Sequence, residues 1–396
     1  MYKRQDLTRL LAIMPNDRVA QLENQVSRLE AYPEYVDQAI ALMREGMKQG
    51  VTPPAITLRD VPAQIRAQMV DDAAQSPLLK GFVEVPDTVD ALQAETVRKR
   101  AETAYRKAVV PALERLLEFT ENQYLPAARD SIAARDLPNG VEWYQHNVAV
   151  RTTTKLTPQQ IHDIGLAEVQ RIRAEMDEVI KSTDFAGSFE EFLHFLRTDP
   201  QFYHTSAEAL LQEYRDICKR ADPELTRLFG KLPRTPYGVV EVPEYAAKST
   251  TTAYYQRGSV KAGRAGYYFA NTYALETRPR WEMEALSLHE AVPGHHLQIS
   301  LQNEMDEVPW FRQIASYTAF SEGWGLYSES LGEEMGFYQD PYSKFGQLTY
   351  EMWRAIRLVV DTGMHYLGWS RQQAIDFFKE NAGKSEHDIV VEIDRY

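Results

Sequence analysis

Residues 266–296 read GYYFANTYALETRPRWEMEALSLHEAVPGHH and contain both of the patterns that run through the chain. The first part is rich in tyrosine. Two similar runs precede it, TPYGVVEVPEY and STTTAYYQRG, and Gly and Pro punctuate all three, as is typical of strands. From about Arg280 the apolar spacing becomes helical and stays so to the end of the chain, with short interruptions. We therefore predict one small β-sheet, between about 236 and 275, directly before a histidine-bearing helix.

The segments that precede the predicted sheet are helical by the same criterion. Apolar residues recur three or four positions apart in 17–49, 87–121 and 158–176. We expect the first segment to form a helix pair broken near Pro33, and the third to start after Thr157 with Pro158 in its first turn. The fold class is therefore predicted to be mainly α.

Composition excludes several classes of function. The chain has 396 residues, of which 44% are hydrophobic and 26% charged, and its net charge of −13 has the wrong sign for a nucleic-acid-binding protein. No apolar run is long enough for a membrane span. Cys218 is the only cysteine, so any metal must be held by His and carboxylate side chains. No secretory leader is visible, which predicts a cytoplasmic protein as written, or a periplasmic protein or lipoprotein if a leader is missing.

The run HEAVPGHH contains three of the nine histidines and resembles the zinc motif H-E-x-x-H, with Pro293 in the place of its second His. On a regular helix His296 returns to the face of His289, whereas His295 points away by roughly 120°. Pro293 and Gly294 can kink the helix and bring His295 inward instead. Spacing alone leaves His295 and His296 as alternatives, and a His-rich helix end that caps carbonyls is the structural explanation.

Two further clusters follow along the chain. In FSEGWGLYSESLGEEMG, Glu322 and Glu329 share a helix face, and either could complete the two-His, one-Glu ligand set of a catalytic zinc. In EMWRAIRLVVDTGMHYLGW, Asp361 could orient His365 for oxyanion stabilisation or proton transfer, with Arg354 and Arg357 nearby. The structural explanations are a solvated acid for Glu329 and a ladder of helix salt bridges for the second cluster.

At this point the chain resembles a known family. The blocks HEAVPGHHLQ, AFSEGWGLYSE, YEMWRAIRLVVDTGMHYLGWSRQQAIDFF, EIDRY and RTTTKLTPQQIHDIGLAEV resemble those of the bacterial domain-of-unknown-function 885 family, a zincin-like group of metallopeptidases. The family pattern H-E-x-x-P-G-H favours His295 over His296. Family members continue past the final Arg-Tyr pair, so we expect a C-terminally truncated member.

The resemblance implies a helical zincin-like fold with a deep cleft, distantly similar to Taq carboxypeptidase, thimet oligopeptidase and angiotensin-converting enzyme. Within it we expect residues 1–235 to form a helical wall subdomain and 236–396 a catalytic subdomain with the sheet and the metal-binding helices. The two parts are expected to make one continuous two-lobed unit.

The expected function is a zinc-dependent hydrolase that cleaves peptide or small amide substrates, with one Zn²⁺ per chain. His289, His295 and Glu322 are the expected ligands, and Glu290 is the expected general base toward a metal-activated water. The expected oxyanion group is His365 positioned by Asp361, with Tyr396 a weaker candidate. The expected substrate-binding residues are Tyr267, Tyr268, Asn271 and Arg357.

The first three of these substrate-binding residues lie on one predicted strand, which could pair with an extended peptide by strand addition. A core role for the two tyrosines is the alternative. Two other functions are consistent with the same sequence: a non-catalytic, metal-stabilised helical binding protein, and a zinc esterase or amidase acting on non-peptide substrates. The sequence makes no prediction of oligomeric state.

Overall fold

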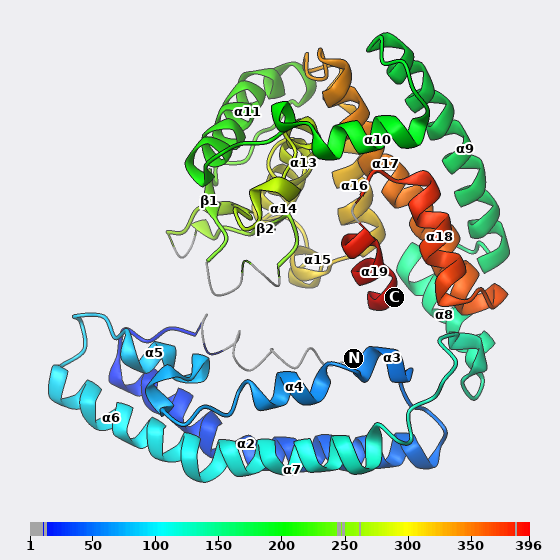
Figure 1. Cartoon of the computed structure of the whole chain (residues 1–396). Helices are drawn as coiled ribbons and strands as arrows, with labels where there is room; N and C mark the ends of the chain where they lie inside the picture. The colour runs from blue at the N-terminus through cyan, green and yellow to red at the C-terminus, as the bar shows by residue number, and fades with distance from the viewer. Residues whose placement is uncertain (1–10, 12–13, 244–246, 248–249, 261–262, 385) are drawn as a thin grey trace. The chain divides into compact units, whose positions relative to one another are not determined.

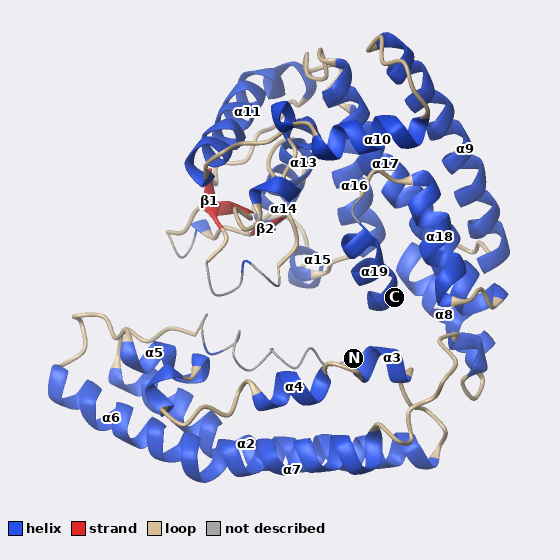
Figure 2. Cartoon of the chain, viewed as in Figure 1, coloured by secondary structure: helices blue, strands red, loops and turns tan. Residues whose placement is uncertain are grey.

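The computed structural model describes residues 11, 14–243, 247, 250–260, 263–384 and 386–396, and Figure 1 labels its elements. Helices dominate the described residues, and the strands form one small sheet, as the mainly α prediction requires (Figure 2). The chain divides into two compact units, the first through Gly140 and the second from Val141. The boundary expected at 235/236 lies inside the second unit, because α11 (Ala207–Leu228) packs against both β1 and α13 beyond that point.

The first unit is a set of helices packed around one apolar core. Its elements are α2 (Val19–Lys48), α3 (Ala55–Leu58), α4 (Val61–Arg66), α5 (Lys80–Val83), α6 (Ala91–Ala104), η3 (Tyr105–Val109), α7 (Val110–Phe119) and η4 (Thr120–Tyr124). The helix pair expected around Pro33 is wrong, because α2 runs through that proline. Leu29 and Val36, fully buried on either side, pack α2 against α6 and α7 and hold it as one helix despite the missing N–H.

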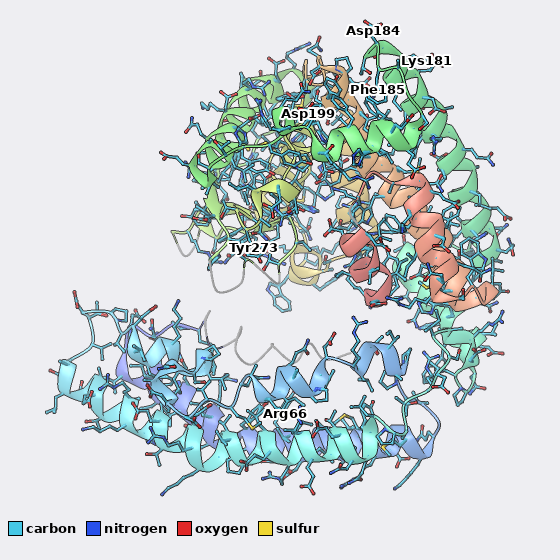
Figure 3. All side chains as sticks on the ribbon, in the orientation of Figure 1. Arg66, Lys181, Asp184, Phe185, Asp199 and Tyr273 are labelled. Carbon is cyan, nitrogen blue, oxygen red and sulfur yellow. The ribbon has the colours of Figure 1, made fainter. Side chains whose placement is uncertain are left out.

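The second unit contains the remaining described helices of four or more residues. They are α8 (Gly140–Thr152), α9 (Pro158–Ser182), α10 (Phe189–Thr198), α11, α13 (Met283–Glu290), α14 (His295–Asn303), α15 (Trp310–Ile314), α16 (Thr318–Ser330), α17 (Pro341–Thr362), η10 (Gly363–Leu367), α18 (Arg371–Asn381) and α19 (Glu386–Arg395). α9 begins where the sequence predicts, with Thr157 and Gln160 forming a reciprocal capping box. In the loop after α9, Phe185 (labelled in Figure 3) packs on Phe192 of α10 with ring centroids 5.2 Å apart.

The sheet lies within the predicted region and has three strands, β1 (Tyr237–Glu241), β2 (Ala253–Gln256) and β3 (Gly266–Ala270). Their order is β1-β3-β2, so β3 is the central strand. β3 pairs in parallel with β1 and antiparallel with β2, and its Tyr268 lies opposite Val239 and Tyr255. The last strand in sequence is thus enclosed by the two earlier ones.

α13 is the most enclosed helix of the second unit. It packs against α11, α16, α17 and β2, and seven of its residues are buried, among them His289 and Glu290 at its C-terminal end. Polar side chains in such a position destabilise the fold unless they have partners. His289 and Glu290 therefore need partners at this position, and the close packing around α13 holds their side chains in place. None of the helices in the described part of the chain is long and apolar enough to cross a membrane.

Candidate metal centre

Three predicted ligands converge from three helices. His289 comes from α13, His295 is the first residue of α14 and Glu322 lies on α16, and one ligand atom of each lies within 4.8 Å of the others. The Nε2 atoms of the two histidines are each 3.7 Å from a Glu322 carboxylate oxygen. In a tetrahedral site with bonds of about 2.0–2.2 Å, two ligand atoms are roughly 3.3 Å apart. These three side chains are therefore a donor set that could hold a metal ion, at spacings somewhat wider than those of an occupied tetrahedral site.

A break in the helix brings the two histidines together. α13 ends at Glu290 and α14 begins at His295, so the expected kink at Pro293 and Gly294 is a complete interruption. A Cβ atom at Gly294 would lie 1.9 Å from the carbonyl oxygen of His289, so only glycine fits at this approach. The imidazole rings of His289 and His295 meet edge to face with centroids 4.6 Å apart.

His296 points to a different environment. Its Nδ1 lies 2.9 Å from the hydroxyl of Tyr255 and 3.3 Å from that of Ser300, and its ring lies against Tyr237 with centroids 4.5 Å apart. The side chain is buried among these groups, so burial lowers its pKa to about 4. Of the two alternatives, the structure brings His295 to the cluster.

Glu329 holds the ring of His289 from the opposite side. Its Oε1 lies 2.7 Å from His289 Nδ1, and its side chain is completely buried. This contact fixes the tautomer that leaves Nε2 facing Glu322. Glu329 is therefore neither the ligand nor the solvated acid that the sequence left open for it. One helix turn earlier, a Cβ at Gly325 would lie 2.5 Å from His289 Cε1, so the close packing of α16 on this ring requires glycine.

The carboxylates at the cluster attract positive charge, and burial keeps one of its two imidazoles neutral. Burial opposes protonation of His289, but the nearby carboxylates of Glu322 and Glu329 outweigh it and raise the pKa of His289 to about 9. The nearby imidazole of His289 is the main cause that lowers the pKa of Glu322 to about 2. Burial lowers the pKa of His295 to about 4, so this imidazole is neutral and has a lone pair for a metal.

Glu290 lies beside the cluster. Burial is the main cause that raises its pKa to about 7, and a hydrogen bond from the Tyr255 backbone opposes that shift. The edge of β2 thus contacts the residue that follows the first ligand. A carboxyl group in this environment can both take up and release a proton near neutral pH.

Arg354 is a member of the cluster that sequence analysis did not assign to it. This residue of α17 has Nη2 3.5 Å from His289 Nε2 and 3.6 Å from Glu322 Oε2. The sequence showed Arg354 and Arg357 three positions apart on one predicted helix, and this spacing did not indicate which of the two would lie at the ligands. Packing of α17 against α13 separates their environments.

Two other predicted catalytic residues lie farther along the chain, Asp361 near the end of α17 and His365 on η10. Asp361 accepts a hydrogen bond from the Tyr144 hydroxyl, and the ring of His365 lies against that tyrosine with centroids 5.8 Å apart. Positions 354 and 365 are separated by about 16 Å along a helix axis at 1.5 Å per residue. His365 therefore lies away from the cluster, and Asp361 contacts Tyr144 and is not among the three residues of the cluster.

Arg357 and Tyr396 belong to a second polar cluster. Glu392 Oε1 accepts hydrogen bonds from Arg357 Nε at 2.8 Å, from the Tyr396 hydroxyl at 2.7 Å and from Trp353 Nε1 at 3.1 Å. These contacts join α19 to α17. Both residues thus contact Glu392 in the structure, whereas the sequence analysis expected Arg357 to bind substrate and Tyr396 to stabilise the oxyanion.

Tyr268 on β3 and Asn271 just after it are buried and contact other parts of the protein. Tyr268 is fully buried against Tyr214, with ring centroids 5.3 Å apart, so it takes the core role and cannot contact a substrate. Asn271 is buried and its Nδ2 donates to the carbonyls of Ala247, Thr250 and Thr251, while its Oδ1 accepts from the backbone of Tyr273 (labelled in Figure 3).

Strand addition at β3 is wrong, because both sides of this central strand, Tyr267 included, are already paired. β1 and β2 form the edges of the sheet. Tyr267 itself is half-buried and lies edge to face with Phe269, with centroids 6.2 Å apart.

Comparisons with known proteins identify the family. No curated protein matches the chain. A solved "putative lipoprotein from Colwellia psychrerythraea" has a TM-score of 0.94 and 30% sequence identity, and the match covers 99% of this chain and 68% of that one. A "putative lipoprotein of unknown function from Shewanella oneidensis" has a TM-score of 0.65 and 18% identity, covering 95% and 68%, and shows likeness of fold alone. The profile described as bacterial protein of unknown function (DUF885) matches residues 2–396, and the chain therefore belongs to the DUF885 family.

Proposed function

We propose that this protein is a zinc-dependent hydrolase of peptide or small amide bonds, with a zincin-like helical fold and one zinc ion per chain. One observation carries the proposal: two imidazoles and a carboxylate from three helices meet beside the buried carboxyl group of Glu290. Two His and one Glu are the protein ligands of a catalytic zinc that keeps an open position. A bound zinc ion would supply Lewis-acid polarisation of the amide carbonyl and lower the pKa of a water.

Glu290 is proposed as the general base and then the general acid. It follows the ligand His289 in sequence and is buried, so its carboxylate can accept the proton of the attacking water and return it to the leaving nitrogen. The Tyr255 backbone contact orients this side chain. Burial keeps bulk water from competing for the same proton.

Arg354 is proposed to stabilise the oxygen that becomes negative, in place of His365. Its guanidinium group lies within 3.6 Å of both His289 and Glu322, so a charged donor is already directed at the cluster. Preformed donors of this kind contribute strongly to catalysis because they need no reorganisation during the reaction. Glu329 is proposed as the positioning residue of His289.

An extracytoplasmic location is proposed for the protein. The relative from Colwellia psychrerythraea, 30% identical, is described as a "putative lipoprotein", which supports the periplasmic or lipoprotein alternative over the cytoplasmic one.

Metal analysis combined with a peptide panel tests the proposal. Purified protein is expected to contain one zinc per chain and to lose both zinc and hydrolysis after chelation, with recovery of both on zinc addition. The panel includes short peptides with L- and D-residues, together with ester and non-peptide amide substrates. Zinc near zero with unchanged thermal stability would favour the non-catalytic binding protein, and turnover of esters or non-peptide amides alone would favour the esterase or amidase.

A further inference from the structure

A pocket of about 450 Å³ lies between α14, α15 and α16. Most of its lining is apolar or aromatic, and Arg312 is the one charged residue in the lining. The lining residues are Phe229, Leu297, Gln298, Leu301, Gln302, Met305, Phe311, Arg312, Ala315, Tyr317, Phe320, Ser321 and Trp324. Pockets that bind small molecules have volumes of about 300–1,000 Å³ and mostly apolar walls. This pocket has the size and composition of a ligand site.

Hydrogen bonds outside the ligand cluster hold the walls of the pocket in place. Trp324 Nε1 donates to the carbonyl of Pro293 at 2.8 Å, which ties α16 to the break between α13 and α14. Gln302 Nε2 donates to the carbonyls of Arg312 and Ala315 at 3.1 and 2.9 Å, which ties α15 to α14. The pocket is therefore formed before any ligand enters.

Aromatic side chains at the pocket are unusually exposed. Phe311, Tyr317 and Phe320 are 64%, 61% and 56% exposed, and all three line the pocket. Single exposed apolar residues are common, but a contiguous group of large ones marks an interaction site.

The pocket adjoins the proposed metal ligands on two helices. Gln298 lies one turn after His295 on α14, and side chains three positions apart on a helix are neighbours at about 5–6 Å between Cβ atoms. Ser321 directly precedes Glu322 on α16. A substrate whose scissile bond lies at the cluster can therefore place an adjacent side chain in the pocket.

We propose that this pocket binds one large apolar side chain of the substrate, preferably an aromatic one, next to the bond that is cut. The inference rests on the proposed function and adds the substrate class. Aromatic walls favour an aromatic occupant through edge-to-face and offset contacts. The lack of an acidic lining residue disfavours lysine or arginine at this position.

Filling the pocket tests the proposal without requiring turnover. Ala315 lines the pocket and directly follows α15, whereas Ala319 is exposed on α16 outside the lining. Ala315→Trp and Ala319→Trp are therefore matched variants. Calorimetric titration with N-acetyl-phenylalanine amide and N-acetyl-alanine amide should show at least about 10-fold tighter binding of the phenylalanine compound to the wild type. Ala315→Trp should remove this preference and Ala319→Trp should keep it.

A second pair covers the case that Ala315→Trp does not fold. Ser321→Trp introduces the same bulk from α16, and Ser330→Trp is its exposed control on the same helix. Zinc content and circular dichroism of each variant show whether the fold and the metal persist. Equal binding of the two amides by the wild type, or an unchanged preference in a folded pocket-filling variant, would overturn the proposal.

Hydrolysis of a peptide panel separates this inference from the proposed function. Cleavage that favours Phe, Tyr, Trp or Leu beside the scissile bond, and loses this preference in Ala315→Trp, supports both. Cleavage with no side-chain preference leaves the hydrolase intact and overturns the pocket. Selective binding without any cleavage overturns the hydrolase and leaves the pocket as a ligand site. A wild-type dimer in sedimentation that Ala315→Trp dissociates would make a second copy the occupant and overturn the proposal.

Discussion

Glu322 and Glu392 each organise a polar cluster in the second unit, yet the two clusters are built differently. Glu322 is 47% exposed, and the nearest imidazole nitrogens are 3.7 Å away, beyond the length of a normal hydrogen bond. The side chain of Glu392 is 9% exposed, and one of its oxygens accepts hydrogen bonds from Trp353, Arg357 and Tyr396 at 2.7–3.1 Å. The Glu322 carboxylate is therefore exposed and can accept further bonds. The Glu392 carboxylate is saturated, because one of its oxygens already accepts three hydrogen bonds.

The difference separates a site that can accept a ligand from a contact that stabilises the fold. A charged cluster whose members already satisfy one another gains little from an added ion, because the ion must displace existing bonds. A cluster whose ligand atoms lie beyond hydrogen-bond distance of one another gains from a cation that completes them. Residue type alone does not distinguish the two cases, since both contain a glutamate and an arginine.

Removal of a ligand should have the largest effect. His289→Ala, His295→Ala and Glu322→Ala are each expected to abolish stoichiometric zinc and hydrolysis, since two remaining ligands hold the ion poorly. His296→Ala is the control and should keep one zinc per chain, because His296 contacts Tyr255 and Ser300 instead. Metal analysis by mass spectrometry measures both outcomes. Zinc retained in the first three variants, or lost in the control alone, would assign the ligands differently.

Glu290→Gln should have the next largest effect and should separate chemistry from metal binding. The amide cannot accept a proton, so kcat should fall by about 10²–10⁴-fold while zinc content stays at one per chain. Steady-state kinetics on the best peptide of the panel, with metal analysis of the same sample, provides the test. Near-normal hydrolysis would exclude Glu290 as the base, and loss of zinc would make it a ligand.

Glu329→Gln should weaken zinc binding without abolishing it. The amide holds His289 Nδ1 less strongly, and loss of such a supporting contact typically lowers metal affinity by about 10–100-fold. Competition with a chromogenic chelator measures the affinity. Glu333→Gln, an exposed change on the segment after α16, should leave it unchanged. Equal affinities in the two variants would show that the buried contact does not support the metal.

Glu392→Gln should have the smallest effect and should act on stability alone. Weaker hydrogen bonds to Arg357 and Tyr396 should lower the free energy of unfolding by about 1–3 kcal/mol, with zinc content unchanged. Glu386→Gln on the same helix removes an exposed ion pair with Lys379 and should cost less than about 1 kcal/mol. Urea denaturation compares the two. A loss of zinc in Glu392→Gln would mean that the saturated cluster supports the metal centre after all.

Local patterns in the sequence predicted the helices and the sheet region, because hydrophobic period and turn residues act over short distances. Strand order was beyond reach, since β3 is central because it pairs not only with β2, the strand just before it, but also with the earlier strand β1. Spacing alone also left open which histidine is the second ligand. Regular helix geometry favoured His296, whereas the break before α14 brings His295 inward. Arg354 could not be assigned to the cluster from the sequence, because its position at the ligands depends on the packing of α17 against α13 and not on its spacing from Arg357.

The break between α13 and α14 also gives the second ligand a helix start of its own. His295 is the first residue of the nine-residue helix α14, so the positive end of the helix dipole lies at this imidazole. The dipole opposes protonation of His295 in the same direction as burial does. An uninterrupted motif helix would lack this second terminus. The consequence is a difference in proton release: zinc uptake near neutral pH should displace the proton of His289 and none from His295.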